Sequence, residues 1–239
     1  MLLQFSMSSV LRTSDFDRHS RLLPSAVLEL FQDAAGEHAD RIGIGFRALE
    51  QRGLLWVVAR TRYIVDRSAQ MYQPVAVTTW PLEPHGYICR REYQITGQDG
   101  AVLIRGSSDW VILDRATRAP VLARELYPAG AAYRAEPALE ERPGRLHEPA
   151  GEPSRFDMTP HYTDVDFNGH VNNTRYADYV LDALRPEQRA VGHFRIDYLH
   201  EVAEGQPLTL LTVQDEARAI CRGLGAEGQA LFVCEVQWK

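Results

Sequence analysis

GAVLIRGSSDW at residues 100–110 and GQALFVCEVQW at residues 228–238 decide the fold of this chain. Both segments begin with glycine, continue with the alternating apolar residues that indicate a strand, and reach tryptophan ten positions later. Other strand-like segments of the two halves match in the same order: WVVARTRYIV (56–65) with VGHFRIDYL (191–199), PVAVTTW (74–80) with PLTLLTV (207–213), and Ile88-Cys89-Arg90 with Ile220-Cys221-Arg222. The chain is therefore an internal duplication, with a period too long for a solenoid.

Each set of strands follows a segment with helical periodicity, at residues 25–39 and 173–184. Asn172 or Asn173 can cap the second helix, and Pro186 ends it. One helix wrapped by a curved antiparallel sheet is the hot-dog arrangement. We therefore predict an α+β fold of two tandem hot-dog repeats packed as a pseudo-dimer, which would bury edge strands that a single repeat exposes. Two unrelated α+β domains are the alternative, which the matched Gly-to-Trp spacing disfavours.

A change of composition divides the chain. Residues 129–153 are mostly Ala, Gly, Pro and Glu, which is typical of a semi-extended linker that buries no core. The expected organisation is an N-terminal repeat at residues 1–128, this linker, and a C-terminal repeat at residues 154–239.

The composition excludes several classes of protein. With 239 residues, 45% of them apolar and 24% charged, the chain is typical of globular proteins, and its apolar runs are too short for a membrane span. A net charge of -6 without a basic block argues against nucleic-acid binding. The start, MLLQFSMSSVLR (1–12), is expected to form a strand and not a signal peptide. Cys89, Cys221 and Cys234 have no metal or redox spacing, which favours a reducing cytoplasm.

The densest polar cluster, TDVDFNGHVNN (163–173), precedes the second helix. If the segment is extended, Asp166, Asn168 and His170 point to one face, because strand side chains alternate. Phe167 and Val171 would then point to the other face, into apolar packing. A carboxylate, an amide and an imidazole together form a general acid–base set.

The same cluster runs into a helix N-terminus, where the amides near Asn173 and Thr174 could form an oxyanion hole.

Three interpretations of this polar cluster compete. From Asp164 the segment fits the first half of a calcium-binding EF-hand loop, but Arg175 stands where the bidentate glutamate belongs. Asp and Asn side chains also cap turns in proteins without any chemistry. Catalysis is favoured because neither of these explains His170.

These residues also resemble a known family. Asp, Asn and His followed by Val-Asn-Asn and Tyr176 resemble the catalytic segment of acyl-acyl carrier protein thioesterases of plant plastids and bacteria. Four segments resemble that family's first hot-dog repeat: LFQDAAGEHADRIGIG (30–45), LLWVVARTRYIV (54–65), RREY (90–93) and GSSDWVILDRATR (106–118). The resemblance covers the chain except the linker and the extreme N-terminus.

The resemblance implies that Asp166, Asn168 and His170 are catalytic, together with a later Glu201. It implies hydrolysis of the thioester of a fatty acyl-acyl carrier protein, releasing free fatty acid. Either carboxylate could attack directly or activate water, while His170 moves the proton. The family's Cys beside that Glu is Val202 here, which excludes a thiol nucleophile at this place.

The implied partner is an acidic acyl carrier protein, for which Arg90, Arg91 and Arg175 are candidate contacts. We expect no cofactor, no metal, no nucleic acid and no membrane span, and a homodimer is an open alternative to a monomer. An acyl-CoA thioesterase would share the fold and chemistry. A non-catalytic acyl-binding module is the remaining alternative, and we see no dehydratase motif.

The first half contains a shorter motif that is similar to the polar cluster, Asp15-Phe16-Asp17-Arg18-His19. It lacks the Asn between the acid and the imidazole. We therefore expect chemistry only in residues 154–239. The first repeat is expected to select the acyl chain, with Leu30, Phe31, Ala34 and residues 54–65 lining its tunnel.

Overall fold

The computed structural model describes residues 4–127, 133–140, 146, 151–187 and 189–239. The chain divides into two compact units. Met1–Thr13 with Leu28–Arg142 form the first unit, and Ser14–Val27 with Pro143–Lys239 form the second. The sequence did not indicate that Ser14–Val27 would group with the C-terminal repeat.

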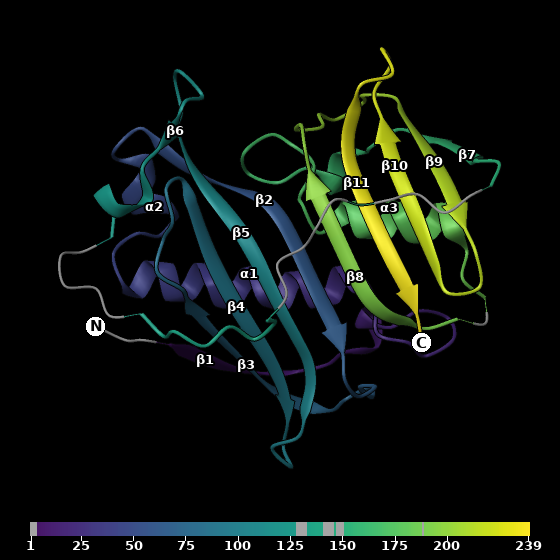
Figure 1. The fold of residues 1–239 in the computed structure, drawn as a ribbon, viewed down its shortest axis with the longest axis horizontal. Coiled ribbons are helices and arrows are strands. Elements are labelled where there is room, and N and C mark those ends of the chain that lie inside the picture. The colour runs from purple at the N-terminus through teal and green to yellow at the C-terminus, as the bar shows by residue number, and fades with distance from the viewer. Residues whose placement is uncertain (1–3, 128–132, 141–145, 147–150, 188) are drawn as a thin grey trace. The chain divides into compact units, whose positions relative to one another are not determined.

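The first unit is one antiparallel sheet with a long helix along one face (Figure 1). Its elements are β1 (Phe5–Val10), α1 (Pro24–Arg41) from Leu28 onward, α2 (Phe46–Glu50), β2 (Leu54–Val65), β3 (Pro74–Pro81), β4 (Ile88–Gly97), β5 (Val102–Asp114) and β6 (Pro120–Val121). The main strands lie in the order β1-β3-β4-β5-β2. Phe31 of α1 stacks on Tyr93 at 4.2 Å between ring centroids, and its ring occupies the space that a Cβ at Gly106 would need.

The second unit repeats this arrangement. Its elements are β7 (Ser154–Met158), α3 (Arg175–Leu184), β8 (Val191–Tyr198), β9 (Leu208–Gln214), β10 (Arg218–Leu224) and β11 (Ala230–Trp238), in the strand order β7-β9-β10-β11-β8. Phe232 of β11 lies opposite Gly223 of β10, and its ring occupies the space that a Cβ at this glycine would need. Tyr176 of α3 packs edge-on against Phe232 at 5.1 Å, which joins the helix to the centre of the sheet.

The predicted duplication is confirmed strand by strand, since β3-β4-β5-β2 and β9-β10-β11-β8 follow the same order. Gly100 and Gly228, the matched glycines, both have left-handed φ angles, of 75° and 80°. Only glycine adopts such angles freely, so both hairpins turn at the same place in the repeat. The two predicted helices and the first strand are also present. In the described chain no helix is both long and apolar enough to cross a membrane.

Most of the expected linker at residues 129–153 lies outside the described residues, but residues 133–140 lie on the first unit. The Glu92 carboxylate accepts the Ala138 N–H at 2.8 Å, and Arg90 donates to the Leu139 carbonyl at 3.0 Å. Leu139 is buried. This stretch therefore binds to the sheet without regular structure and buries Leu139, whereas the composition predicted a semi-extended linker that buries no core. Burial raises the pKa of Glu92, although Arg90 opposes the rise.

Candidate active site

The polar cluster before α3 is a tight turn. Val165 and Val171 form an isolated antiparallel bridge, and the Asp166 N–H donates to the His170 carbonyl at 2.9 Å. The Gly169 N–H returns to the Asp166 carbonyl at 3.0 Å, with a left-handed φ of 82° at the glycine. The prediction of an extended segment is wrong here, because Asn-Gly favours a turn with a positive φ.

The turn rearranges the side chains that alternation would have placed on one face. The Asp166 Oδ1 accepts the Asn168 backbone N–H at 2.8 Å, and the Asn168 amide lies 3.5 Å from the Asp166 Oδ2. Asp166 thus closes the turn through its carboxylate, and it is half-buried. Phe167 sits at the tip and is 76% exposed, so its predicted apolar packing is wrong, whereas Val171 is buried as predicted.

Glu201 lies in the loop that follows β8, and its side chain contacts that of His170. The Glu201 Oε2 lies 3.3 Å from the His170 Nε2, and both side chains are partly exposed, at 36% and 39%. The neighbouring peptide fixes this approach, because the Val171 N–H donates to the Val202 carbonyl at 2.8 Å. A carboxylate and an imidazole that are paired and still accessible can exchange a proton with a bound substrate.

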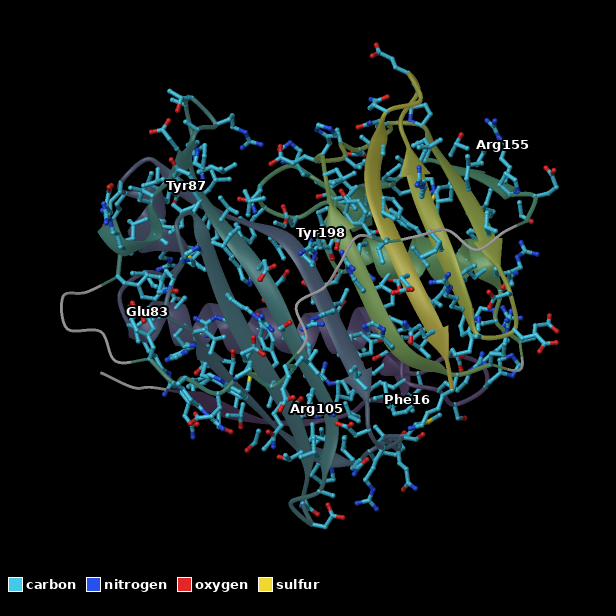
Figure 2. The ribbon with its side chains drawn as sticks, in the orientation of Figure 1. Phe16, Glu83, Tyr87, Arg105, Arg155 and Tyr198 are labelled. Carbon is cyan, nitrogen blue, oxygen red and sulfur yellow. The ribbon has the colours of Figure 1, made fainter. Side chains whose placement is uncertain are left out.

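The start of α3 differs from the expected oxyanion site. The Asn172 Oδ1 accepts the Thr174 N–H and its hydroxyl, each at 3.0 Å. The Thr174 amide is therefore occupied, and the prediction that it is available is wrong. The Asn173 N–H has no acceptor in the part of the chain that the structure describes. The hydroxyl of Tyr198, at the end of β8 (Figure 2), donates to the Asn173 carbonyl at 2.8 Å and holds this peptide in place.

The expected basic contacts for a partner are only in part on the surface. Arg91 is buried, with its guanidinium 3.0 Å from the His38 Nδ1, so its prediction as a surface contact is wrong. Side chains alternate along β4, and Arg91 points to the helix side. Arg90 is bound to Glu92 at 2.6 Å, while Arg175 is partly exposed.

Both halves of the chain match models of one family. Residues 3–127 match the acyl-ACP thioesterase N-terminal domain, and residues 147–238 match the C-terminal domain. The chain belongs to the acyl-ACP thioesterase family. An acyl-[acyl-carrier-protein] hydrolase of Cuphea viscosissima is 28% identical over 227 residues, which cover 87% of this chain and 54% of that protein. A dodecanoyl-[acyl-carrier-protein] hydrolase of Cinnamomum camphora is 27% identical over 226 residues, which cover 88% and 57%. The chain thus spans about half the length of these curated relatives.

Solved structures of the acyl-ACP thioesterase family share the fold. An acyl-ACP thioesterase from Bacteroides thetaiotaomicron superposes with a TM-score of 0.89, covering 99% of this chain and 98% of that one. The 12:0-ACP thioesterase from Umbellularia californica gives 0.86, covering 100% and 98%. Each is 22% identical in sequence. The predicted tandem hot-dog fold is therefore confirmed.

This family member also carries a turn in its first repeat that matches the catalytic candidate. Phe16 and Leu22 form the bridge, and the Asp17 N–H donates to the Arg21 carbonyl at 2.9 Å. Ser20 holds the left-handed position, with a φ of 59°. The two apolar bridge residues lie six positions apart in both turns, and that spacing is the sequence signal that aligns them.

The alignment of the two turns gives Arg21, and not His19, the place of His170. His19 instead takes the place of Asn168, since its backbone N–H donates to the Asp17 Oδ1 at 2.8 Å. Sequence reasoning compared the two histidines and missed Arg21. The first turn therefore pairs its acid with a guanidinium, which does not give up a proton near neutral pH.

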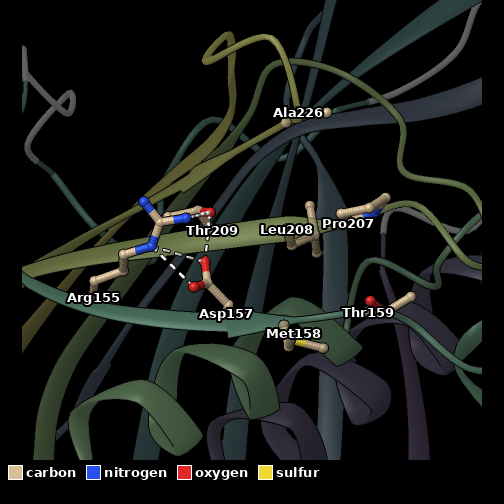
Figure 3. Close-up of a pocket in the computed structure, with 9 residues that line it drawn as sticks. Arg155, Asp157, Met158, Thr159, Pro207, Leu208, Thr209 and Ala226 are labelled. Carbon is tan, nitrogen blue, oxygen red and sulfur yellow. Dashed lines mark hydrogen bonds and ion pairs between the residues drawn. The ribbon is translucent and has the colours of Figure 1, made fainter.

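A surface cleft of about 440 Å³ lies between β7, β9 and the β10–β11 hairpin (Figure 3). The Asp157 carboxylate binds Arg155 at 2.9 Å and the Thr209 hydroxyl at 2.6 Å within it. None of the four catalytic candidates lines this cleft. Its polar ion-paired wall is unsuited to an acyl chain.

Proposed function

We propose that this chain hydrolyses the thioester bond of fatty acyl-acyl carrier protein and releases free fatty acid. The proposal rests on the 3.3 Å approach of Glu201 to His170 beside the Asp166 turn. That approach joins the two separate segments to which the family resemblance assigned catalytic roles. Membership of the family supports the same activity.

In the proposed mechanism the Asp166 and Glu201 carboxylates flank the thioester carbonyl. The attacking water gives a proton to one of these carboxylates as its oxygen bonds to the carbonyl carbon. Asn168 holds the Asp166 carboxylate at the turn, which supports its role as an orienting residue. His170, held by Glu201, carries the proton to the departing sulfur.

The developing oxyanion needs a donor, and we assign this role to the Asn173 N–H. Two observations support the assignment. The amide precedes the first turn of α3, and no described residue accepts its hydrogen bond. When the carbon–sulfur bond breaks, the carbonyl reforms as a carboxylic acid and the phosphopantetheine sulfur leaves as a thiol.

We assign acyl-chain selection to the first repeat, where Phe31 and Tyr93 fill the space between helix and sheet. An acyl carrier protein is the proposed partner. The location of the protein in the bacterial cytoplasm and its assembly as a homodimer stay predictions. The buried, unpaired Cys89, Cys221 and Cys234 support a reducing compartment, while the matched plant relatives carry names that mark them as chloroplastic.

A panel of acyl-acyl carrier protein thioesters of different lengths tests the proposal, with release of fatty acid measured by mass spectrometry. Parallel reactions with acyl-CoA thioesters compare kcat/KM for the two carriers. We expect a higher kcat/KM with the carrier protein and loss of release in His170→Ala. Absence of release at every length by folded protein contradicts the proposed hydrolysis, and a higher kcat/KM with CoA contradicts the proposed partner.

A further inference from the structure

The first unit carries a dense group of arginines at one end of its sheet. Residues 46–53 comprise α2 and the turn into β2, and residues 114–125 run from the end of β5 through β6 and a short 3-10 helix. We call these two segments the arginine end. They contain three acids and five exposed arginines: Arg47, Arg52, Arg115, Arg118 and Arg124. The arginine end therefore has a net charge of +2 in a chain whose net charge is -6.

Backbone hydrogen bonds hold the two segments of the arginine end side by side. The Arg115 N–H donates to the Gly53 carbonyl at 2.8 Å, next to the ladder pair of Leu54 and Asp114. Gly53 has a left-handed φ of 68°, which allows the chain to turn from α2 into β2 at this place. The arginines of the α2 segment and those of the hairpin after β5 therefore belong to one surface.

Little of this positive charge is neutralised within the described part of the chain. The Asp114 carboxylate is turned into its own hairpin, where it accepts a backbone N–H at 2.8 Å and a hydroxyl at 2.9 Å. Glu50 approaches Arg115 only to 3.9 Å, and both side chains are about half exposed. No described acid forms an ion pair with Arg47 or Arg52. The arginine end thus keeps charge that an acidic partner can neutralise.

The opposite end of the same sheet differs in this respect. β2 runs for 12 residues from the arginine end, which is about 40 Å of strand. Near its far end the Arg105 guanidinium binds the Asp66 carboxylate through two hydrogen bonds of 2.8 Å. Arg67, which follows β2, lies 3.5 Å from Asp99. Arginines at the far end therefore have carboxylate partners within the protein.

Two exposed aromatic side chains lie at the arginine end. Phe46 begins α2 and is 37% exposed. Tyr87 is 46% exposed at the same end of the unit (Figure 2). The carbonyl of the residue before it accepts the Ala123 N–H, next to Arg124, at 3.2 Å. Aromatic residues and arginine are both enriched in protein–protein interfaces, so this composition fits a protein partner better than a free anion.

We propose that the arginine end is a docking surface for an acidic protein, which under the proposed function is the acyl carrier protein. Positive charge on a net acidic chain attracts and orients such a partner, and it acts mainly on the rate of association. The inference rests on the proposed function for the identity of the partner, but not for the location of the surface. This surface takes the place of the predicted contact at Arg91, which is buried.

Charge reversal at the two ends of β2 tests the proposal. Arg47→Glu combined with Arg52→Glu changes the arginine end, and Arg67→Glu combined with Arg155→Glu makes the same change of net charge at exposed positions elsewhere. We expect the first pair to lower kcat/KM on an acyl-acyl carrier protein by about tenfold, mostly through KM, and the control pair to change it by less than about twofold. Melting temperatures check the fold, and Arg47→Gln with Arg52→Gln repeats the test with a smaller change of charge.

Salt gives a second readout of the same contact. Raising the ionic strength from about 0.02 to 0.3 M shortens the range of the interaction between exposed charges. The kcat/KM of the wild-type protein should therefore fall, while that of the Arg47→Glu and Arg52→Glu pair should change less. The control pair should keep the salt dependence of the wild type. Equal effects of the two pairs on kcat/KM and on its salt dependence would overturn the proposal.

Thioesters of the same acyl chain on pantetheine and on CoA show what the surface recognises. Acyl-pantetheine carries neither a protein nor a nucleotide, so its hydrolysis should be equal in all variants. A loss on acyl-CoA as large as that on the carrier protein would contradict docking of a protein, because the arginines would then bind phosphate.

Direct binding separates this proposal from the proposed function. If the wild-type protein hydrolyses none of the thioesters, the proposed function fails. Surface plasmon resonance with an acylated carrier protein still tests the docking surface, because it does not depend on turnover. We expect weaker binding by the Arg47→Glu and Arg52→Glu pair than by the wild type and the control pair, and equal binding by all three would refute the proposal.

Discussion

Arg21 binds the carboxylate of Asp17 at 2.6 Å, at the place in the first turn where the second turn carries His170. The same backbone frame thus holds an acid with a permanent cation in one repeat and an acid with an imidazole in the other. Arg21 also donates to the Arg189 carbonyl at 2.5 Å, which ties the first turn to other residues of the second unit. The first turn is therefore built for stability, and the second leaves its polar groups accessible.

Asp17→Asn should lower the stability of the protein and leave kcat within about twofold. Burial acts to raise the pKa of Asp17, but hydrogen bonds from Arg21 and two amides outweigh it and hold the pKa below the usual 3.8. A carboxyl with a lowered folded pKa stabilises the fold above its usual pKa, and this contribution is lost as the pH falls through the folded value. We expect a loss of about 1 kcal/mol and of roughly 2–4 °C in Tm at pH 7. The Tm difference should shrink below about pH 4.

Asp166→Asn should have the opposite effect to Asp17→Asn: it should lower kcat and leave the stability of the protein unchanged. An Asn side chain still offers an oxygen to the Asn168 N–H, so the turn and the Tm should survive. Loss of the carboxylate should lower kcat by at least about 100-fold, the lower range for removal of an acid–base group. Stopped assays on both Asn variants, with melting curves, make the comparison. A well-folded Asp166→Asn with kcat within threefold of wild type would show that Asp166 only closes the turn.

His170→Ala and His19→Ala separate the two repeats. His19 is exposed and takes the structural place of Asn168 in a turn whose acid is bound by Arg21. His19→Ala should leave kcat nearly unchanged, whereas His170→Ala should lower it by about 100-fold or more. Circular dichroism checks the fold of both variants on one substrate series. Similar losses in the two would refute the restriction of chemistry to the second repeat.

Residue periodicity was sufficient to predict both helices and the matched strands. In each repeat the helix buries one face against the sheet, and the strands bury one face against the helix. It failed at the turn of residues 165–171, where the positive φ of Gly169 outweighs the alternation of its neighbours. Alternation along β4 also does not tell which of the two faces of the strand is buried. Only the packing of the sheet against α1 shows that Arg91 is interior. The pairing of Glu201 with His170 joins distant segments through an irregular loop, so residue spacing alone could not predict it.

Phe31→Leu should shift the preferred acyl chain to greater length. Phe31 fills the space beside Gly106 and stacks on Tyr93, so a smaller side chain opens room between helix and sheet. A pocket wall discriminates by about 1–3 kcal/mol per methylene, which predicts a change in the kcat/KM ratio of neighbouring chain lengths. Competition assays with mixed acyl-acyl carrier protein thioesters measure that ratio directly. A uniform change in turnover at all lengths would count against acyl selection by the first repeat.

Val202→Cys tests whether a thiol beside Glu201 could act as a nucleophile in this fold. The Val202 side chain is fully buried, so a thiol there should stay protonated and out of reach of the substrate. The native thiols provide the precedent, since burial raises the pKa of both Cys89 and Cys221 to about 12. We expect kcat within about twofold of wild type and no reaction with a thiol-specific colour reagent, whereas the exposed control Tyr72→Cys reacts at once. Rapid labelling of Val202→Cys, together with loss of activity on labelling, would mean that this position faces the site after all.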